Sequence, residues 1–92
     1  MAEYLHIYIS PKDGVTRAQM DKKLNLAIDW YRYARGVYVV YTTSSADKWK
    51  ARLIDFVKPQ GRLFICRMDA SQRQGWMNKD FWDWLKKERK AV

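Results

Sequence analysis

The residues of this chain with the clearest chemical potential are three ring side chains near its beginning. Strict alternation over residues 4–9 places Tyr4, His6 and Tyr8 on one face of a predicted strand. The other face carries only aliphatic side chains, which a small domain hides in its core. The rings therefore predict a stacking surface for nucleobases, a subunit interface, or a surface covered by another part of the chain.

Net charge narrows the choice of partner. The 92 residues include 18 Lys and Arg against 10 Asp and Glu, which gives a net charge of +8. Such a balance favours anionic partners, namely nucleic acid, an acidic protein surface or anionic lipid. We therefore predict that outward rings and basic helical side chains contact RNA or DNA. The predicted nucleic-acid-binding residues are Tyr4, His6, Tyr8, Tyr38, Lys48, Lys50, Arg52, Lys86, Lys87, Arg89 and Lys90.

Groups suited to catalysis are few. His6 is the only histidine, and no Ser/His/Asp or Cys/His spacing accompanies it. Asp13 and Asp69 follow predicted strands and offer carboxylates for a divalent cation, but turn chemistry explains both positions at least as well. The sequence has no phosphate-binding loop, dinucleotide fingerprint or zinc-ligand spacing. We predict no catalytic residue, no metal ligand and no cofactor.

The elements that must position these residues alternate between strand and helix. Apolar side chains at helical spacing predict a first helix that begins after Thr16, in a capping box, and extends to Ile28. A second apolar stripe predicts a helix capped by Ser44 or Ser45, and Asn78 is a suitable cap for a third. Strands are predicted over residues 4–9, 30–33, 37–42 and 62–68.

This order predicts one α+β domain over residues 1–92, a ferredoxin-like βαββαβ sandwich with an extra C-terminal helix. If residues 30–33 were helical instead, a three-stranded parallel sheet would result. In either case the first two helices must cover the aliphatic face of the first strand. The apolar run over residues 62–68 is nearly continuous, which predicts that the last strand has a central position in the sheet.

Cysteine usage and hydropathy bear on the compartment. Cys66 is the only cysteine, so no intrachain disulfide forms, and its apolar neighbours predict a small core residue. No stretch approaches the roughly 18 consecutive apolar residues of a membrane span, and the N-terminus lacks the pattern of a signal peptide. We predict a cytoplasmic protein that does not enter a membrane.

Several segments together resemble a known family. They are Tyr4 to Tyr8, Val37 to Thr42 followed by Ser45-Ala46-Asp47, Gly61 to Arg67, and Trp76 before Trp84 and Leu85. In these segments the chain is similar to the SinR-like proteins, a bacterial group related in fold to the small CRISPR adaptation endoribonucleases and to virulence-associated protein D. The resemblance implies a ferredoxin-like fold and a homodimer, with nucleic-acid binding or metal-dependent cleavage. Those nucleases place an aspartate at the end of the first strand, where this chain has Ile9-Ser10-Pro11.

We therefore predict a small basic module that binds nucleic acid, or a protein associated with it, as a homodimer and without catalysis. Two alternatives remain open. One is a metal-dependent endoribonuclease that uses Asp13 or Asp69. The other is an inhibitor or adaptor from a mobile element, whose basic surface meets an acidic protein partner.

Overall fold

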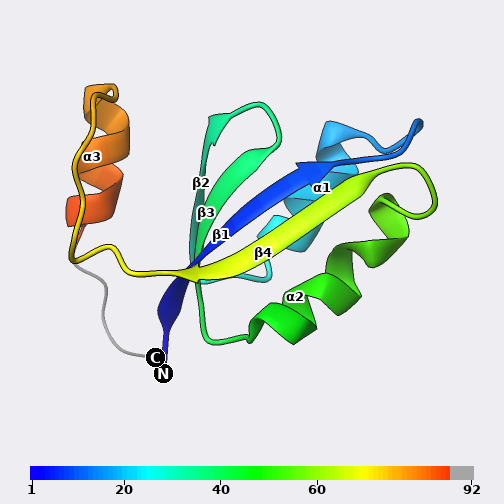
Figure 1. The fold of residues 1–92 in the computed structure, drawn as a ribbon, viewed down its shortest axis with the longest axis horizontal. Coiled ribbons are helices and arrows are strands. Elements are labelled where there is room, and N and C mark those ends of the chain that lie inside the picture. The colour runs from blue at the N-terminus through cyan, green and yellow to red at the C-terminus, as the bar shows by residue number, and fades with distance from the viewer. Residues whose placement is uncertain (88–92) are drawn as a thin grey trace.

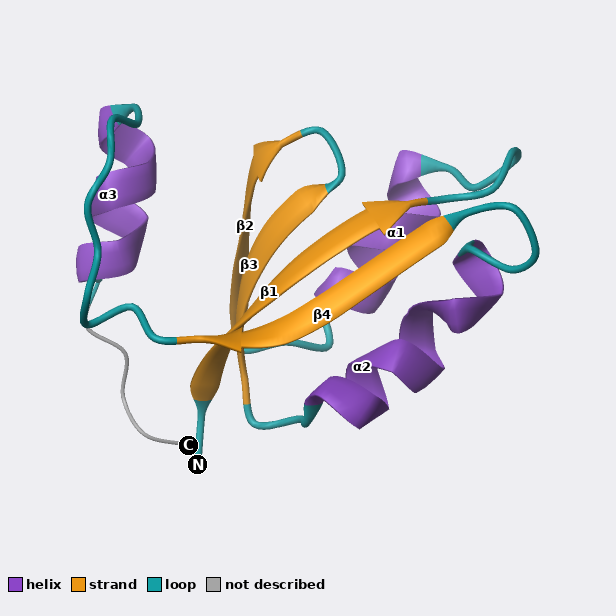
Figure 2. Ribbon diagram, viewed as in Figure 1, coloured by secondary structure: helices purple, strands orange, loops and turns teal. Residues whose placement is uncertain are grey.

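The computed structural model describes residues 1–87. Its elements follow the predicted order of strand, helix, two strands, helix, strand and final helix (Figures 1 and 2). They are β1 (Glu3–Ser10), α1 (Arg17–Leu24), β2 (Asp29–Ala34), β3 (Val37–Thr42), α2 (Ala46–Leu53), β4 (Arg62–Met68) and α3 (Lys79–Lys86), with a 3₁₀ turn (Ile54–Phe56) after α2. The segment 30–33 is therefore a strand, as predicted.

The strands form one four-stranded antiparallel sheet in the order β2-β3-β1-β4. The prediction of a central position for β4 was wrong, because β4 lies at the edge beside β1. Its apolar run serves two surfaces. Leu63 and Ile65 pack against the core, whereas Phe64 and Cys66 lie exposed on the other side of the sheet. The prediction that Cys66 is a core residue was wrong for the same reason.

The core lies between the sheet and the layer formed by α1 and α2 (Figure 1). The aliphatic face of β1 packs there as predicted, with Leu5, Ile7 and Ile9 each no more than 1% exposed. Trp49 of α2 is fully buried against them, and its indole Nε1 donates a 3.2 Å hydrogen bond to Thr42 Oγ1. This bond satisfies the indole donor inside the core.

The helices begin where their capping residues predict. The Thr16 side chain accepts from the Gln19 backbone N–H, and the Gln19 side chain accepts from the Thr16 backbone, which completes the capping box of α1. Ser45 caps α2 and Asn78 caps α3. The prediction of a first helix as far as Ile28 was wrong. That residue donates a 2.9 Å backbone hydrogen bond to Tyr41 and so leads the chain into the sheet.

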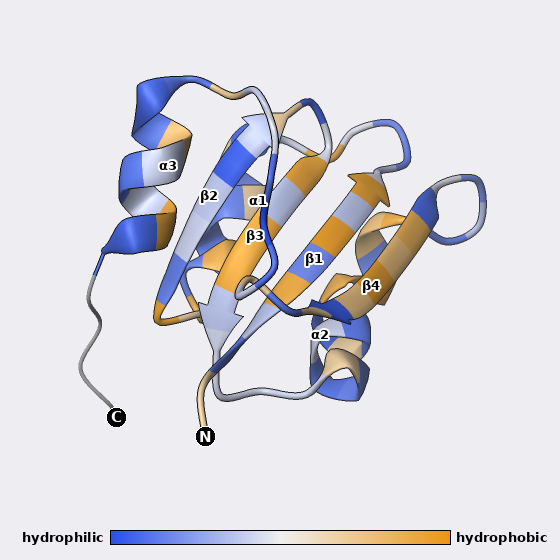
Figure 3. Cartoon of the chain, turned by 60° about the vertical axis from the view of Figure 1, so that its left-hand side comes forward, coloured by the Kyte–Doolittle hydropathy of each residue, from blue (hydrophilic) through white to orange (hydrophobic). Residues whose placement is uncertain are grey.

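The second face of the sheet is covered only in part. α3 lies on the side opposite to α1 and α2 (Figure 1). Its Phe81 ring lies 5.6 Å from that of Tyr31 and 5.5 Å from that of Tyr33, and its Leu85 is only 6% exposed. In Figure 3, α3 stands beside β2 and the segment before it passes in front of β3, whereas no helix of the described chain stands over β1 and β4. Among residues 1–87, no helix is both long and apolar enough to cross a bilayer.

Candidate functional site

Two of the outward rings of β1 have ring partners within the chain. Tyr4 lies 5.0 Å from Tyr41 and 6.0 Å from Trp84 of α3, measured between ring centroids. A 2.7 Å hydrogen bond joins His6 Nε2 to the Tyr33 hydroxyl, and burial raises the pKa of that hydroxyl. The interpretation that the C-terminal helix covers these rings therefore holds for Tyr4, which contacts Trp84 of α3. His6 is instead joined to Tyr33 of β2.

Tyr8, the third outward ring, lies beyond this cover. Its side chain is 39% exposed, and its cross-strand partner Phe64 is 60% exposed. Arg62 and Cys66 share the outward side of β4 with Phe64, because side chains two positions apart point the same way. We call the surface formed by Tyr8, Arg62, Phe64 and Cys66 the β1–β4 face. It presents two neighbouring rings to solvent beside a guanidinium group.

The assignment of Tyr38 to the outward rings was wrong. Tyr38 pairs with Ile7, so the register places it on the helix-covered side of the sheet, where it is only 4% exposed. Trp30 packs against it at 6.0 Å. Each face of β3 carries valine and one tyrosine, so alternation within the strand could not reveal which face is buried.

The predicted basic side chains of α2 do not meet the outward rings. Lys48 and Lys50 are exposed, but α2 packs on the opposite side of the sheet from the β1–β4 face (Figure 1). The Arg52 guanidinium lies 4.7 Å from the centre of the Trp49 ring, in a cation–π contact. Arg52 therefore covers the core, and the structure does not bring these three residues to the predicted site.

The predicted C-terminal basic cluster is described only in part. Lys86 is exposed at the end of α3, and the Lys87 ammonium lies 3.6 Å from the Asp29 carboxylate of β2. Arg89 and Lys90 lie outside the described residues. The described part of this cluster therefore lies next to β2, at the edge of the sheet opposite to β4.

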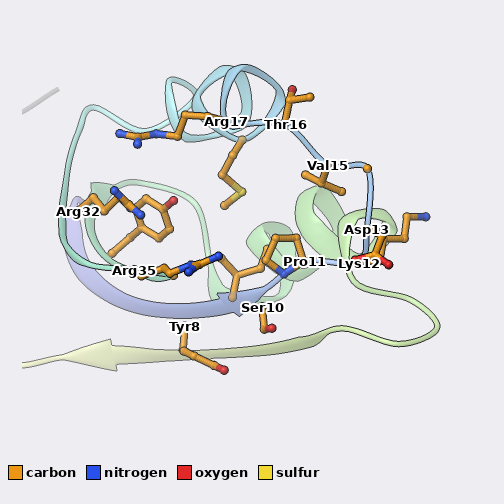
Figure 4. Close-up of a pocket in the computed structure, with 15 residues that line it drawn as sticks. Tyr8, Ser10, Pro11, Lys12, Asp13, Val15, Thr16, Arg17, Arg32 and Arg35 are labelled. Carbon is orange, nitrogen blue, oxygen red and sulfur yellow. The ribbon is translucent and has the colours of Figure 1, made fainter.

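A cleft that the sequence did not predict lies at the end of β1. Its volume is about 590 Å³, and Tyr8 belongs both to its lining and to the β1–β4 face. The basic side chains that line it are Lys12, Arg17, Arg32 and Arg35 (Figure 4). They come from a loop, a helix, a strand and a hairpin turn. Sequence spacing gives no signal for such a set, because only the fold brings its members together.

The two aspartates considered for a cation lie far apart. Asp13 follows β1 at the end where Ser10 pairs with Arg62, and Asp69 follows β4 at the other end, about 20 Å along the strands. The Asp69 carboxylate accepts hydrogen bonds from the Ser71 hydroxyl at 2.7 Å and from its backbone N–H at 2.9 Å, which hold its pKa below the usual range. The structure does not bring the two aspartates together, and residues 1–87 contain no group of three metal-ligating side chains.

Comparison of the chain with protein-family models, with curated proteins and with solved structures gave no match. The resemblance to the SinR-like proteins therefore stays a prediction that rests on the sequence segments alone.

Proposed function

We propose that this chain is a ferredoxin-like protein that binds single-stranded nucleic acid on its β1–β4 face. The fold assignment is supported by the strand order β2-β3-β1-β4 and by the position of α1 and α2 on one side of the sheet. The function is carried by one observation. Tyr8 and Phe64 are cross-strand neighbours, and both rings remain accessible, whereas the other outward rings of the sheet are partly buried.

Exposed neighbouring rings are suited to bases that are not paired. Each base that stacks on an aromatic side chain contributes about 1 to 3 kcal/mol, and every base offers a flat surface for this contact. A duplex hides those surfaces between its own base pairs, so single strands are the better ligand. The β1–β4 face thus supplies affinity that depends little on the base sequence of the nucleic acid.

Charge supplies the second part of the affinity. Arg62 extends from the same side of β4 as Phe64 and is exposed, and it forms no ion pair with any described residue. Arg67 points to the other side of β4, the side that carries Ile65. Its guanidinium lies 3.6 Å from the Glu3 carboxylate. Arg62 is therefore the arginine of β4 that is available for a phosphate, and the net charge of +8 attracts the strand from a distance.

The test is a salt titration of binding to labelled single-stranded RNA and DNA, followed by fluorescence anisotropy. Phe64→Leu keeps an apolar side chain but removes the ring, and we expect it to weaken binding about tenfold. Tyr8→Phe keeps the ring and should bind like the wild type, whereas Tyr8→Ala should bind more weakly. Equal affinity of the wild type and Phe64→Leu would contradict the proposal.

Charge variants complete this test. Arg62→Gln should reduce the slope of the log–log salt plot by about one, because one phosphate contact is lost. Lys48→Gln is the matched control, since it removes one charge from the opposite side of the molecule. If the two variants change the slope equally, the β1–β4 face is not the site.

A homodimer through the same face is the second candidate. Phe64 is a large apolar side chain at 60% exposure, and it lies on an edge strand that has a partner on one side only within the described sheet. Phe64→Leu separates the two functions, because an apolar interface tolerates leucine whereas base stacking does not. Light scattering of the wild type, Phe64→Leu and Phe64→Asp should show loss of a dimer only in the aspartate variant if such a dimer forms.

A further inference from the structure

The cleft at the end of β1 has an apolar floor and a charged rim. The floor is formed by the buried side chains of Ile9, Met20 and Tyr38, which are at most 4% exposed. Arg17, Arg32 and Arg35 lie at one end of the cleft (Figure 4). An apolar floor with a few polar groups at one side is the usual composition of a site for a small ligand group.

The arginine end of the cleft lacks counter-charge. Arg17 forms an ion pair with Asp21 at 3.2 Å, but Arg32 and Arg35 form none with any described residue. Asp13 is the only acidic side chain in the described lining, and it lies at the other end of the cleft (Figure 4). Neighbouring guanidinium groups repel one another, so an anion between them would relieve an unfavourable arrangement. Arginine has the planar donor geometry that suits phosphate oxygens.

Backbone hydrogen bonds hold both walls of the cleft in place. The Ile9 N–H donates to the Gly36 carbonyl at 2.8 Å, which ties the β2–β3 hairpin turn to β1. The Lys12 N–H donates to the Phe56 carbonyl, also at 2.8 Å, which ties the opposite loop to the turn after α2. A ligand therefore meets walls that are already positioned, and little ordering opposes binding.

We propose that this cleft binds the terminal phosphate of a nucleic-acid strand, with Arg32 and Arg35 as the contacting residues. The inference rests on the proposed function, because Tyr8 connects the cleft to the β1–β4 face and so lets one strand reach both. A terminal phosphate carries a charge of about −1.5 to −2 at neutral pH, whereas each phosphate within a strand carries one. Two unpaired arginines therefore favour the end of a strand over its interior.

The experiment compares matched single-stranded oligonucleotides with a terminal phosphate and with a terminal hydroxyl. The wild type should bind the phosphorylated strand about tenfold more tightly, because hydrogen bonds between charged groups are added. The double variant Arg32→Gln with Arg35→Gln should lose this preference. Arg67→Gln, which removes an arginine paired with Glu3 at the far end of β4, should retain it. Equal binding of both strands by the wild type would overturn the proposal.

A thermal measurement gives a readout that does not depend on the β1–β4 face. Inorganic phosphate should raise the melting temperature of the wild type above that in chloride of equal ionic strength, and it should not do so for the double variant. If oligonucleotides bind without regard to the terminal group, the β1–β4 face stands and the cleft proposal fails. A second outcome is that no oligonucleotide binds but phosphate still stabilises only the wild type. This result would overturn both the proposed function and the proposal that the ligand of the cleft is the end of a nucleic-acid strand. A mononucleotide that binds as tightly as the phosphorylated strand would also overturn the strand end.

Discussion

At the level of single residues, Gly36 connects the fold to the cleft. It has a φ of +73° in the β2–β3 turn, and a Cβ at this position would lie 2.5 Å from the Ile9 carbonyl oxygen. That oxygen belongs to the residue whose N–H bonds to Gly36. Only a residue without a side chain fits both the conformation and the space.

Gly36→Ala should therefore lower the free energy of unfolding by about 1 to 3 kcal/mol, measured by urea denaturation. Gly14→Ala is the matched control, because Gly14 has a φ of +92° but no neighbouring atom within 4 Å of its Cβ position. It should cost only the conformational strain of about 1 kcal/mol. An alanine at position 36 that is tolerated better than one at position 14 would contradict the close approach.

The hydroxyl of Tyr33 should make the stability of the fold depend on pH in the alkaline range. Burial raises the pKa of its hydroxyl, so the folded chain holds this proton more tightly than the unfolded chain does. The resulting stabilisation is complete below the unfolded tyrosine value of about 10 and is lost as the pH rises through the folded value.

The free energy of unfolding should accordingly fall above about pH 10, and it should fall less in Tyr33→Phe than in the wild type. Tyr8→Phe is the control at an exposed tyrosine and should follow the wild type. The account of Tyr33 would be wrong if both variants kept the wild-type profile.

At the level of elements, α3 determines which half of the aromatic surface is available. Phe81 is its central contact, since its ring meets both Tyr31 and Tyr33 of β2. Without this contact the rings of β2 would be accessible, and the β1–β4 face would no longer be distinct from the rest of the sheet.

Phe81→Ala should lower the free energy of unfolding by about 1 to 3 kcal/mol, since a half-buried ring is removed from an aromatic cluster. Lys86→Ala replaces an exposed residue in the same helix and should change stability by no more than about 0.5 kcal/mol. Equal stability of the two variants would show that α3 is not held by its aromatic side.

Local patterns predicted the elements well because their causes are local. The alternation over residues 4–9 identified β1 and its buried face. Thr16, the pair Ser44 and Ser45, and Asn78 identified three helix starts, and Ser45 proved to be the cap of α2. The register between strands is not local. It placed Tyr38 on the buried side through its pairing with Ile7, against the prediction.

The candidate site was predicted only in part for the same reason. Tyr8 was named from the alternation of β1, but Phe64 became its neighbour through pairing across 56 positions of the sequence, from residue 8 to residue 64. Arg32 of β2 and Arg35 of the β2–β3 turn belong to a hairpin that contacts the end of β1 through the hydrogen bond from Ile9 to Gly36. A sequence read along its length contains no spacing that joins these segments.

At the level of the whole molecule, the two sides of the sheet have different roles. α1 and α2 enclose the core on one side, and α3 closes part of the other (Figure 1). The β1–β4 face lies on the part of the second side that stays open, whereas the floor of the arginine cleft lies on the helix-covered side with Tyr38. Tyr8, near the end of β1, borders both. Among residues 1–87, exposed basic side chains occur on both sides of the sheet, such as Arg62 on one and Lys48 on the other. Charge alone would therefore attract an anionic strand without selecting the proposed face.

The most direct test of this account is the NMR spectrum of the isotopically labelled protein during titration with a single-stranded oligonucleotide. We predict that amide shifts concentrate around Tyr8, Arg62 and Phe64 and continue to Arg35 in the cleft. Shifts confined to the outer side of α2 around Lys48 and Lys50, or no shifts at physiological salt, would contradict binding on the β1–β4 face.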